Sequence, residues 1–134
     1  MTKEELCRKA QDMLPMAYVP YSHFRVGAAL ECDDGTVFTG CNIENAAYSP
    51  TNCAERTAIF KAVSEGHRDF AAIAVCGGKG GKLAGLCTPC GVCRQVLQEF
   101  CKEDFPIYLA HKDGYKLLTL GDLLPYSFGE ASLK

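Results

Sequence analysis

Four residues in two short motifs have the chemistry and the spacing of a catalytic metal site. Cys90 and Cys93 form a Pro-Cys-x-x-Cys motif, and Cys53 and Glu55 form a Cys-x-Glu motif, each where a helix is expected to begin. Two cysteines three positions apart on a first helical turn direct their sulfurs to one side, and the positive helix N-terminus favours the thiolates that zinc requires. We predict that Cys53, Cys90 and Cys93 bind one zinc ion. Three protein ligands leave its fourth position open, as catalytic zinc requires.

Glu55 is the candidate general acid and base of this site. It lies two positions after Cys53, and a carboxylate beside zinc-activated water is suited to proton transfer. A structural alternative is a capping box, in which Asn52 caps the helix and Glu55 reaches back to it. For Glu55 taken alone, the capping box is the commoner explanation. The joint occurrence of the two cysteine motifs, each opening a helix, favours the catalytic interpretation.

Two arginines follow the cysteines at helical spacing. Arg56 comes three positions after Cys53, and Arg94 comes four positions after Cys90, so each is expected on the face that carries the ligand. Zinc with three thiolates carries a net charge of about −1, which weakens its ability to acidify water. We predict that Arg56, Arg94 or both donate hydrogen bonds to the sulfurs and offset this negative charge.

A further cysteine, Cys87, leaves two other metal sites to consider. With the two cysteines of the neighbouring motif it begins a run typical of ferredoxins, but Leu97 occupies the next position of that run, which excludes an iron–sulfur cluster. A closed four-cysteine zinc site with Cys87 as fourth ligand would be structural and catalytically inactive. Pro89 favours an extended segment that directs Cys87 away from the helix. The four-cysteine site stays open as an alternative.

Hydrophobic periodicity and turn residues predict the elements that must position these groups. Helices are predicted for residues 2–17, 53–65, 90–101 and 121–124. Strands are predicted for residues 24–32, 36–41, 71–76, 107–110 and 115–118. Residues 77–85 are rich in glycine and lysine but lack the P-loop pattern, so we predict a mobile surface loop. The mixture indicates one α/β sheet with helices on its faces.

The bulk composition limits the class of function. The 134 residues fit one domain, residues 1–134, and a formal net charge of −2 leaves no broad basic surface for nucleic acid. No apolar run is long enough to span a membrane, and residues 1–5 do not resemble a signal peptide, so we expect a cytoplasmic protein. In that reducing compartment, nine cysteines indicate metal binding or a reactive thiol rather than disulfides.

Several segments together resemble one enzyme family. Residues 21–29 (YSHFRVGAA), 40–46 (GCNIENA) and 53–58 (CAERTA), with the Pro-Cys-x-x-Cys motif, closely resemble the small homotetrameric cytidine deaminases. The resemblance implies a three-layer α/β/α sandwich around a five-stranded mixed sheet, with one Zn²⁺ per subunit. It also implies a homotetramer that acts on a small-molecule nucleoside and has no nucleic-acid or membrane partner.

The same resemblance implies how the substrate is held. Asn42 and Glu44 would hydrogen-bond the ribose hydroxyl, and Phe24 would stack on or flank the pyrimidine ring. The backbone of Ala54 would read the edge of the base together with the carboxylate of Glu55. Without the family, Asn42 and Glu44 would be interpreted as turn residues.

The resemblance also implies a role for two aromatic residues and a particular reaction. Tyr48 and Phe128 resemble residues that such tetramers contribute to a neighbouring subunit's site, with an ordinary core or interface role as the alternative. The implied reaction is the hydrolytic deamination of cytidine and deoxycytidine to uridine and deoxyuridine plus ammonia, in pyrimidine salvage, with Glu55 moving the protons. A structural four-cysteine zinc module and a deaminase of another cytosine nucleoside are the alternatives.

Overall fold

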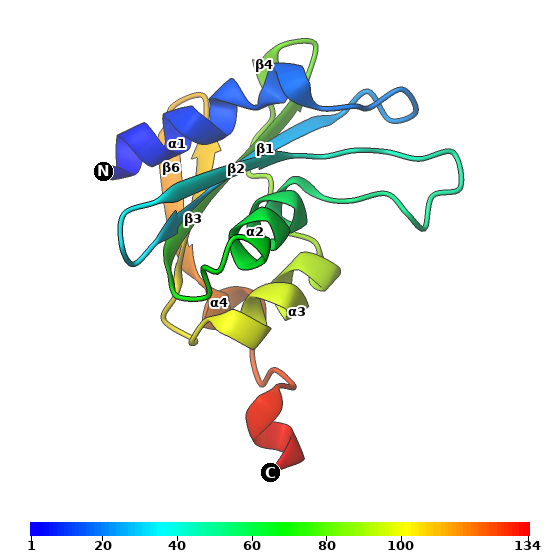
Figure 1. The fold of residues 1–134 in the computed structure, drawn as a ribbon. Helices are drawn as coiled ribbons and strands as arrows, with labels where there is room; N and C mark the ends of the chain where they lie inside the picture. The colour runs from blue at the N-terminus through cyan, green and yellow to red at the C-terminus, as the bar shows by residue number, and fades with distance from the viewer.

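A mixed β-sheet runs through the centre of the computed structural model, which describes residues 1–134 (Figure 1). Its strands lie in the order β2-β1-β3-β5-β6, and the short strand β4 pairs with β3. Only the β3–β5 pair is parallel. The bounds are Arg25–Cys32 for β1, Val37–Cys41 for β2, Phe70–Lys79 for β3, Lys82–Leu83 for β4, Pro106–His111 for β5 and Gly114–Thr119 for β6.

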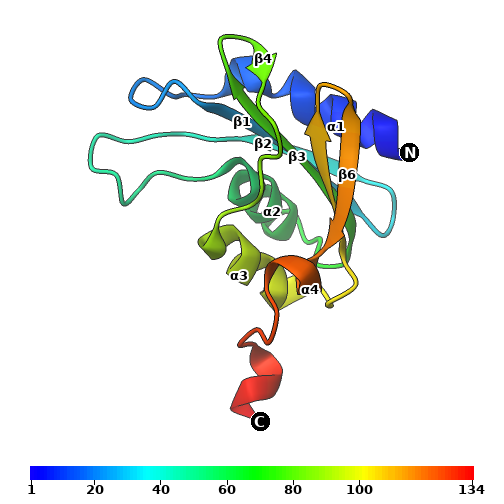
Figure 2. The same ribbon diagram turned by 180° about the vertical axis from the view of Figure 1, so that it is seen from behind.

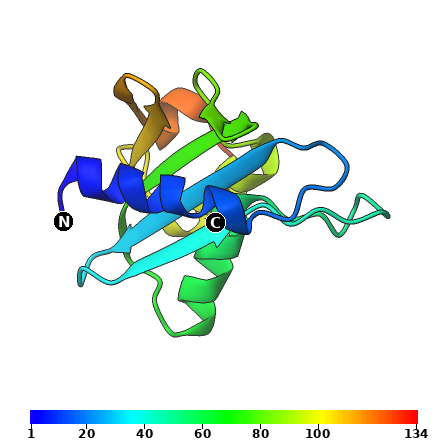
Figure 3. The same ribbon diagram turned by 90° about the horizontal axis from the view of Figure 1, so that it is seen from above.

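Helices cover the two faces of the sheet and complete the predicted three layers (Figures 1 and 3). Helix α1 packs on one face, and α2 and α3 pack on the other. None of these helices has the length and apolar character needed to cross a membrane. The bounds are Lys3–Asp12 for α1, Ala54–Ser64 for α2, Gly91–Phe100 for α3 and Leu120–Leu123 for α4, with 3₁₀ turns at Leu14–Met16 (η1) and Glu130–Leu133 (η2).

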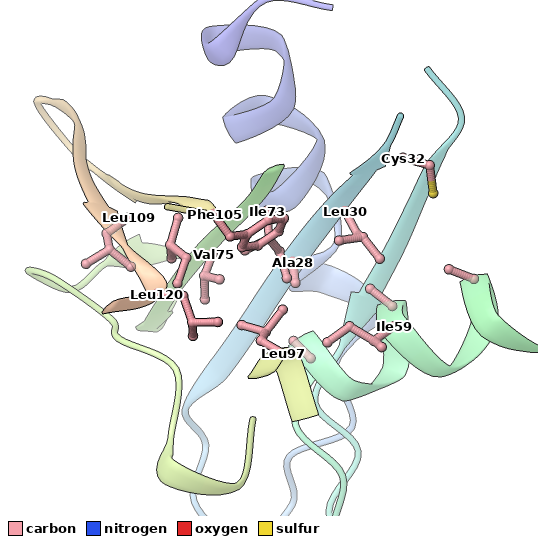
Figure 4. Packing of buried hydrophobic residues seen from close by; sticks show 14 residues of the cluster. Ala28, Leu30, Cys32, Ile59, Ile73, Val75, Leu97, Phe105, Leu109 and Leu120 are labelled. Atoms are coloured by element: carbon pink, nitrogen blue, oxygen red, sulfur yellow. The ribbon is translucent and has the colours of Figure 1, made fainter. Parts of the chain in front are cut away.

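Side-chain alternation along the central strands places the two larger core clusters on opposite faces of the sheet. Ala28 and Leu30 of β1 face the layer of α2 and α3, where they pack with Ile59 and Leu97 (Figure 4). Ala29, between them, packs on the opposite face against α1. Successive side chains of a strand point to opposite faces, so a strand buried on both sides requires apolar residues at every position. This explains the uncharged runs at residues 26–30 of β1 and 70–76 of β3.

The prediction of a mobile loop at residues 77–85 was wrong. Strand β3 continues to Lys79, and a tight turn leads into β4, which pairs back onto β3 through Gly78 and Leu83. This hairpin adds a sixth strand to the five that were predicted (Figure 2). Gly80 and Gly81 form its turn with φ values of 59° and 76°, a conformation that glycine adopts without steric cost.

Gly40 sets how closely α2 approaches the sheet. A Cβ at this position of β2 would lie 2.3 Å from the carbonyl oxygen of Ala54 and 2.6 Å from the amide nitrogen of Ala58. Because both atoms belong to backbone, the helix would have to move. We expect Gly40→Ala to destabilise the fold by about 1–3 kcal/mol in urea unfolding. Gly85→Ala is the control, since its Cβ would meet nothing within 4 Å, and equal stability of the two variants would contradict the prediction.

Candidate active site

The three predicted ligand cysteines meet where two helices begin. Cys53 is the N-cap of α2, Cys90 is the N-cap of α3, and Cys93 lies in the first turn of α3. Their sulfur atoms all lie within 4.8 Å of one another, and those of Cys53 and Cys90 are 3.6 Å apart. Tetrahedral zinc with Zn–S bonds of about 2.3 Å requires sulfurs about 3.8 Å apart. The donor set and its spacing therefore fit one zinc ion.

Cys87 does not join this group. The atoms that lie mutually within 4.8 Å are the sulfurs of Cys53, Cys90 and Cys93 alone. The Cys87 sulfur lies instead against Gly77, where a Cβ would come within 2.8 Å both of this sulfur and of the Phe24 ring. The structure thus provides three thiol ligands rather than four, and the closed structural site is not favoured.

Arg56 lies beside the sulfurs, as predicted. Its Nη2 donates a hydrogen bond to the Cys53 sulfur at 3.2 Å, and its buried Nε has no hydrogen-bond partner in the chain. The pKa of Cys53 is well below its usual value, first because the Cys93 thiol donates to it and then because Arg56 and Cys90 do. A thiolate is the form of cysteine that binds zinc. A guanidinium is therefore already placed next to the negative charge that metal binding requires.

Arg94 does not share this role. Its Nε donates to the carbonyl oxygen of Pro89 at 2.6 Å, and its Nη1 donates to that of Leu123 at 2.7 Å. The expectation that it contacts a sulfur is therefore corrected. Arg94 instead ties the start of α3 to the end of α4. Its long side chain reaches two carbonyls that would otherwise lack partners, and a hydrogen bond to a charged donor is stronger than one to a neutral donor.

Glu55 is buried next to the cysteines, and its carboxylate accepts only from its own backbone amide. Its exposed fraction is 3%, and no side chain or backbone group of another residue donates a hydrogen bond to its carboxylate. The capping-box alternative is excluded, because the N-cap of α2 is Cys53 and no side chain caps this helix. Burial raises the pKa of Glu55 to about 7, and the negative charge of Cys53 adds to the shift. A buried carboxyl that no other residue hydrogen-bonds is uncommon except where it has a function.

The predicted ribose-binding residues already organise the segment around Phe24. The Asn42 side chain accepts from the Val26 amide at 2.8 Å and donates to the Phe24 carbonyl at 2.9 Å. The Glu44 carboxylate accepts hydrogen bonds from the Tyr21 amide and from both the amide and the hydroxyl of Ser22. These bonds lower the pKa of Glu44, the Ser22 hydroxyl most strongly.

Ser22 is a site residue that sequence reasoning missed. Its hydroxyl donates to Glu44 and accepts from the Phe24 amide at 3.0 Å, so it connects the predicted ribose and base contacts. Thr57 was missed as well, although its hydroxyl donates to the carbonyls of Cys41 and Cys53, each at 3.1 Å. A serine in a loop and a threonine in a helix carry no distinctive signal, because only the contacts between distant segments assign their roles.

Two segments project from the body of the chain, the connection between β2 and α2 and the C-terminal segment after α4 (Figure 1). By their positions in the sequence, Tyr48 belongs to the first segment and Phe128 to the second. Tyr48 is 75% exposed and has a φ of 63°, and Phe128 is 60% exposed. The core alternative for these two aromatics is therefore wrong. Gln95 of α3 holds the Phe128 carbonyl through a hydrogen bond of 2.8 Å, which ties the C-terminal segment to the helix that carries two of the ligands.

The fold and the site define a zinc-dependent hydrolytic enzyme of the α/β class. Two helix N-termini bring three thiols to one point, and a buried carboxyl that no other residue hydrogen-bonds lies beside them. Helix N-termini stabilise negative charge, so the arrangement suits thiolate ligands as well as an acid–base residue.

Comparisons with known proteins identify the family. Residues 1–109 match the family model described as the cytidine and deoxycytidylate deaminase zinc-binding region. A cytidine deaminase from Sporosarcina psychrophila is 50% identical over 134 residues, covering 99% of this chain and 96% of that protein. The crystal structure of cytidine deaminase from Burkholderia pseudomallei superimposes with a TM-score of 0.88 at 46% identity, covering 96% and 100% of the two chains. The chain belongs to this deaminase family.

Proposed function

We propose that this protein hydrolyses cytidine and deoxycytidine to uridine and deoxyuridine plus ammonia. The observation that carries the proposal is the buried carboxyl of Glu55, which no other residue hydrogen-bonds and which lies beside three converging thiols. Relatives at about half identity over nearly the whole chain are named cytidine deaminases. Glu44 adds support for a free nucleoside, since a carboxylate at the ribose would repel a phosphate attached nearby.

Glu55 moves the protons in the proposed mechanism. When bound to Cys53, Cys90 and Cys93, zinc supplies the Lewis acidity that makes water nucleophilic at neutral pH. Glu55 accepts a proton from the attacking water and delivers it to N3 of the base as the oxygen bonds to C4. It then accepts the remaining proton of that oxygen and passes it to the amino group, which leaves C4 as ammonia while C4 becomes a carbonyl. A pKa near 7 suits a residue that acts as both general base and general acid, because the carboxyl can take up and release a proton at neutral pH.

The remaining substrate contacts are proposed for Phe24, Asn42, Glu44 and Ala54. Phe24 stacks on or flanks the pyrimidine, and its position depends on Asn42, which holds its carbonyl. Asn42 retains an unused N–H and a lone pair for the ribose hydroxyl, and Glu44 retains further acceptor capacity. The backbone of Ala54, the first residue of α2, reads the edge of the base.

A homotetramer is the proposed assembly. Tyr48 and Phe128 are exposed on projecting segments and would reach the site of a neighbouring subunit. A shallow apolar groove on α2 and α3, lined in part by Phe60, Val92 and Val96, offers a surface for contact between subunits. Light scattering coupled to size exclusion tests this assembly. A monomer that turns over at full rate would remove Tyr48 and Phe128 from the site.

The setting we propose is pyrimidine salvage in the cytoplasm. All nine cysteines are free thiols in the structure, which suits a reducing compartment.

The loss of cytidine absorbance in the presence of one equivalent of zinc tests the proposed activity. We expect turnover of cytidine and deoxycytidine, loss of activity with a strong chelator, and recovery when zinc is restored. Cytosine nucleosides altered in the sugar or at C5 serve as competing substrates, because a deaminase of another cytosine nucleoside is the alternative. Zinc bound without turnover of any of them would contradict the proposal.

We expect Arg56 to make the attacking water easier to deprotonate. Removing its guanidinium leaves the charge of three thiolates without compensation, so water becomes harder to deprotonate. We therefore expect Arg56→Gln to move the acidic limb of the kcat/KM profile to higher pH. Arg94→Gln is the matched control, since Arg94 contacts carbonyls and no sulfur. Identical pH profiles for Arg56→Gln and the wild-type protein would exclude this role.

A further inference from the structure

Three metal-binding side chains gather at the end of the sheet opposite the active site. Cys32 ends β1, Asp34 lies in the turn that follows, and His67 comes shortly after α2. One sulfur, one carboxylate oxygen and one ring nitrogen from these residues lie within 4.8 Å of one another. Strand β1 begins beside Phe24, and α2 begins at the ligand Cys53, so the cluster lies at the far ends of both elements.

The distance between His67 and Asp34 matches that between two ligands of one metal ion. Nδ1 of His67 lies 3.5 Å from Oδ2 of Asp34, and two ligands bound at about 2.1 Å in a tetrahedral site are about 3.4 Å apart. The other oxygen of Asp34 accepts from the Thr36 amide at 2.9 Å, which orients the carboxylate. Such a second contact is the usual way in which proteins fix a metal-binding carboxylate.

The imidazole of His67 is also held in place. Its ring packs edge-on against Phe38, with the ring centroids 5.1 Å apart. Its backbone amide donates to the Ala62 carbonyl at 2.9 Å, and Gly66 before it has a φ of 92°. The end of α2 therefore presents the imidazole to the hairpin turn in one fixed orientation. A ligand that is oriented in advance loses less entropy on binding.

The surroundings of the cluster favour a cation. Glu31 and Asp33 flank Cys32, and the Asp33 amide donates to the Asp69 carbonyl at 2.9 Å, which brings a third acidic residue to this end of the sheet. Cys32 is 2% exposed, yet it lies at the margin of the core with its sulfur apart from Leu30 and Ile73 (Figure 4). Burial first, and then Asp34, Asp33 and Glu31, raise the pKa of Cys32 to about 11, so the group is a neutral thiol when no cation is present.

We propose that Cys32, Asp34 and His67 bind a second zinc ion, which fastens the β1–β2 turn to the end of α2. One sulfur, one nitrogen and one oxygen donor suit zinc better than calcium or magnesium, which prefer oxygen ligands alone. Binding releases the Cys32 proton to solvent and places a sulfur lone pair on the metal, with water as the fourth ligand. The inference is independent of the proposed deaminase activity, because none of the three residues belongs to the active site.

Zinc binding at equilibrium measures the number of sites. Protein stripped by a chelator is dialysed against micromolar free Zn²⁺, and the metal is counted per chain. We expect about two zinc ions in the wild-type protein and about one in His67→Phe and Asp34→Asn. His67→Phe keeps a ring against Phe38, and Asp34→Asn keeps the acceptor for the Thr36 amide, so both variants should fold. Deaminase activity should be unchanged in both, which separates this site from the catalytic zinc.

A titration with Co²⁺ tests whether the Cys32 sulfur is a metal ligand. Protein holding one equivalent of zinc is titrated with Co²⁺, and thiolate-to-cobalt charge-transfer absorption is followed. We expect the absorption in the wild-type protein and in the control Cys7→Ala, a buried cysteine on the opposite face of the sheet, but not in Cys32→Ala. One zinc ion in the wild-type protein, a second zinc ion retained in His67→Phe, or equal cobalt absorption in Cys32→Ala would each overturn the proposal. The first of these results would leave His67 and Asp34 as neighbouring side chains that bind no metal.

Discussion

Glu55→Gln is expected to lose nearly all conversion of cytidine to uridine while it keeps its zinc and its fold. Glutamine has almost the same shape as glutamate but can neither take up a proton from water nor release one to the base. General acid–base catalysis contributes about 10²–10⁴-fold to a rate, so kcat should fall by about that factor. We expect kcat to change more than KM, because proton transfer occurs in the transition state.

Glu65→Gln is the matched control for this prediction. Glu65 is an exposed glutamate at the other end of the same helix, and its replacement should leave kcat unchanged. Zinc content and circular dichroism establish that Glu55→Gln is folded and loaded. Retention of more than about a tenth of the wild-type kcat by loaded Glu55→Gln would remove Glu55 from the proposed role, given the usual size of acid–base effects.

Cys90→Ser is expected to lose both the catalytic zinc ion and the activity without loss of the fold. Serine is a preferred N-cap residue, so it serves the start of α3 at least as well as cysteine does. It is a much poorer zinc ligand than a thiolate. Zinc affinity should fall by more than the roughly 10–100-fold that the loss of an outer-shell partner costs. Metal content after dialysis and kcat at saturating cytidine measure the two effects, and full zinc occupancy in Cys90→Ser would contradict the three-thiol site.

Cys87→Ser is the control that separates the two zinc schemes. Cys87 lies outside the group of three sulfurs and against Gly77, so its loss should leave one catalytic zinc ion per chain and most of the activity. Under a closed four-cysteine site, Cys87→Ser would lose zinc as readily as Cys90→Ser does. The pair of serine variants therefore decides the coordination number without weakening the N-cap of α3.

Most elements of the fold were predictable from local signals, and the hairpin at residues 77–85 shows where those signals fail. Glycine normally marks a turn or a loop. In β3, however, a Cβ at Gly78 would lie 1.8 Å from the Lys82 carbonyl, so glycine is required there by the close approach of β4. Composition does not distinguish a glycine that bends the chain from a glycine that lets another segment approach, because the difference lies in a contact partner.

The sequence by itself determined which residues bear the chemistry, since the three cysteines and Glu55 are marked by spacing at helix starts, which is a local property. The tertiary structure decided how these groups are used. It placed Cys87 outside the group of three sulfurs. It placed Arg56, and not Arg94, in contact with a ligand sulfur. It also showed that Glu55 does not cap its helix. It also brought Cys32, Asp34 and His67 together from three segments. These outcomes depend on distances and burial between residues far apart in the chain, and the packing of helices on the sheet alone fixes those quantities.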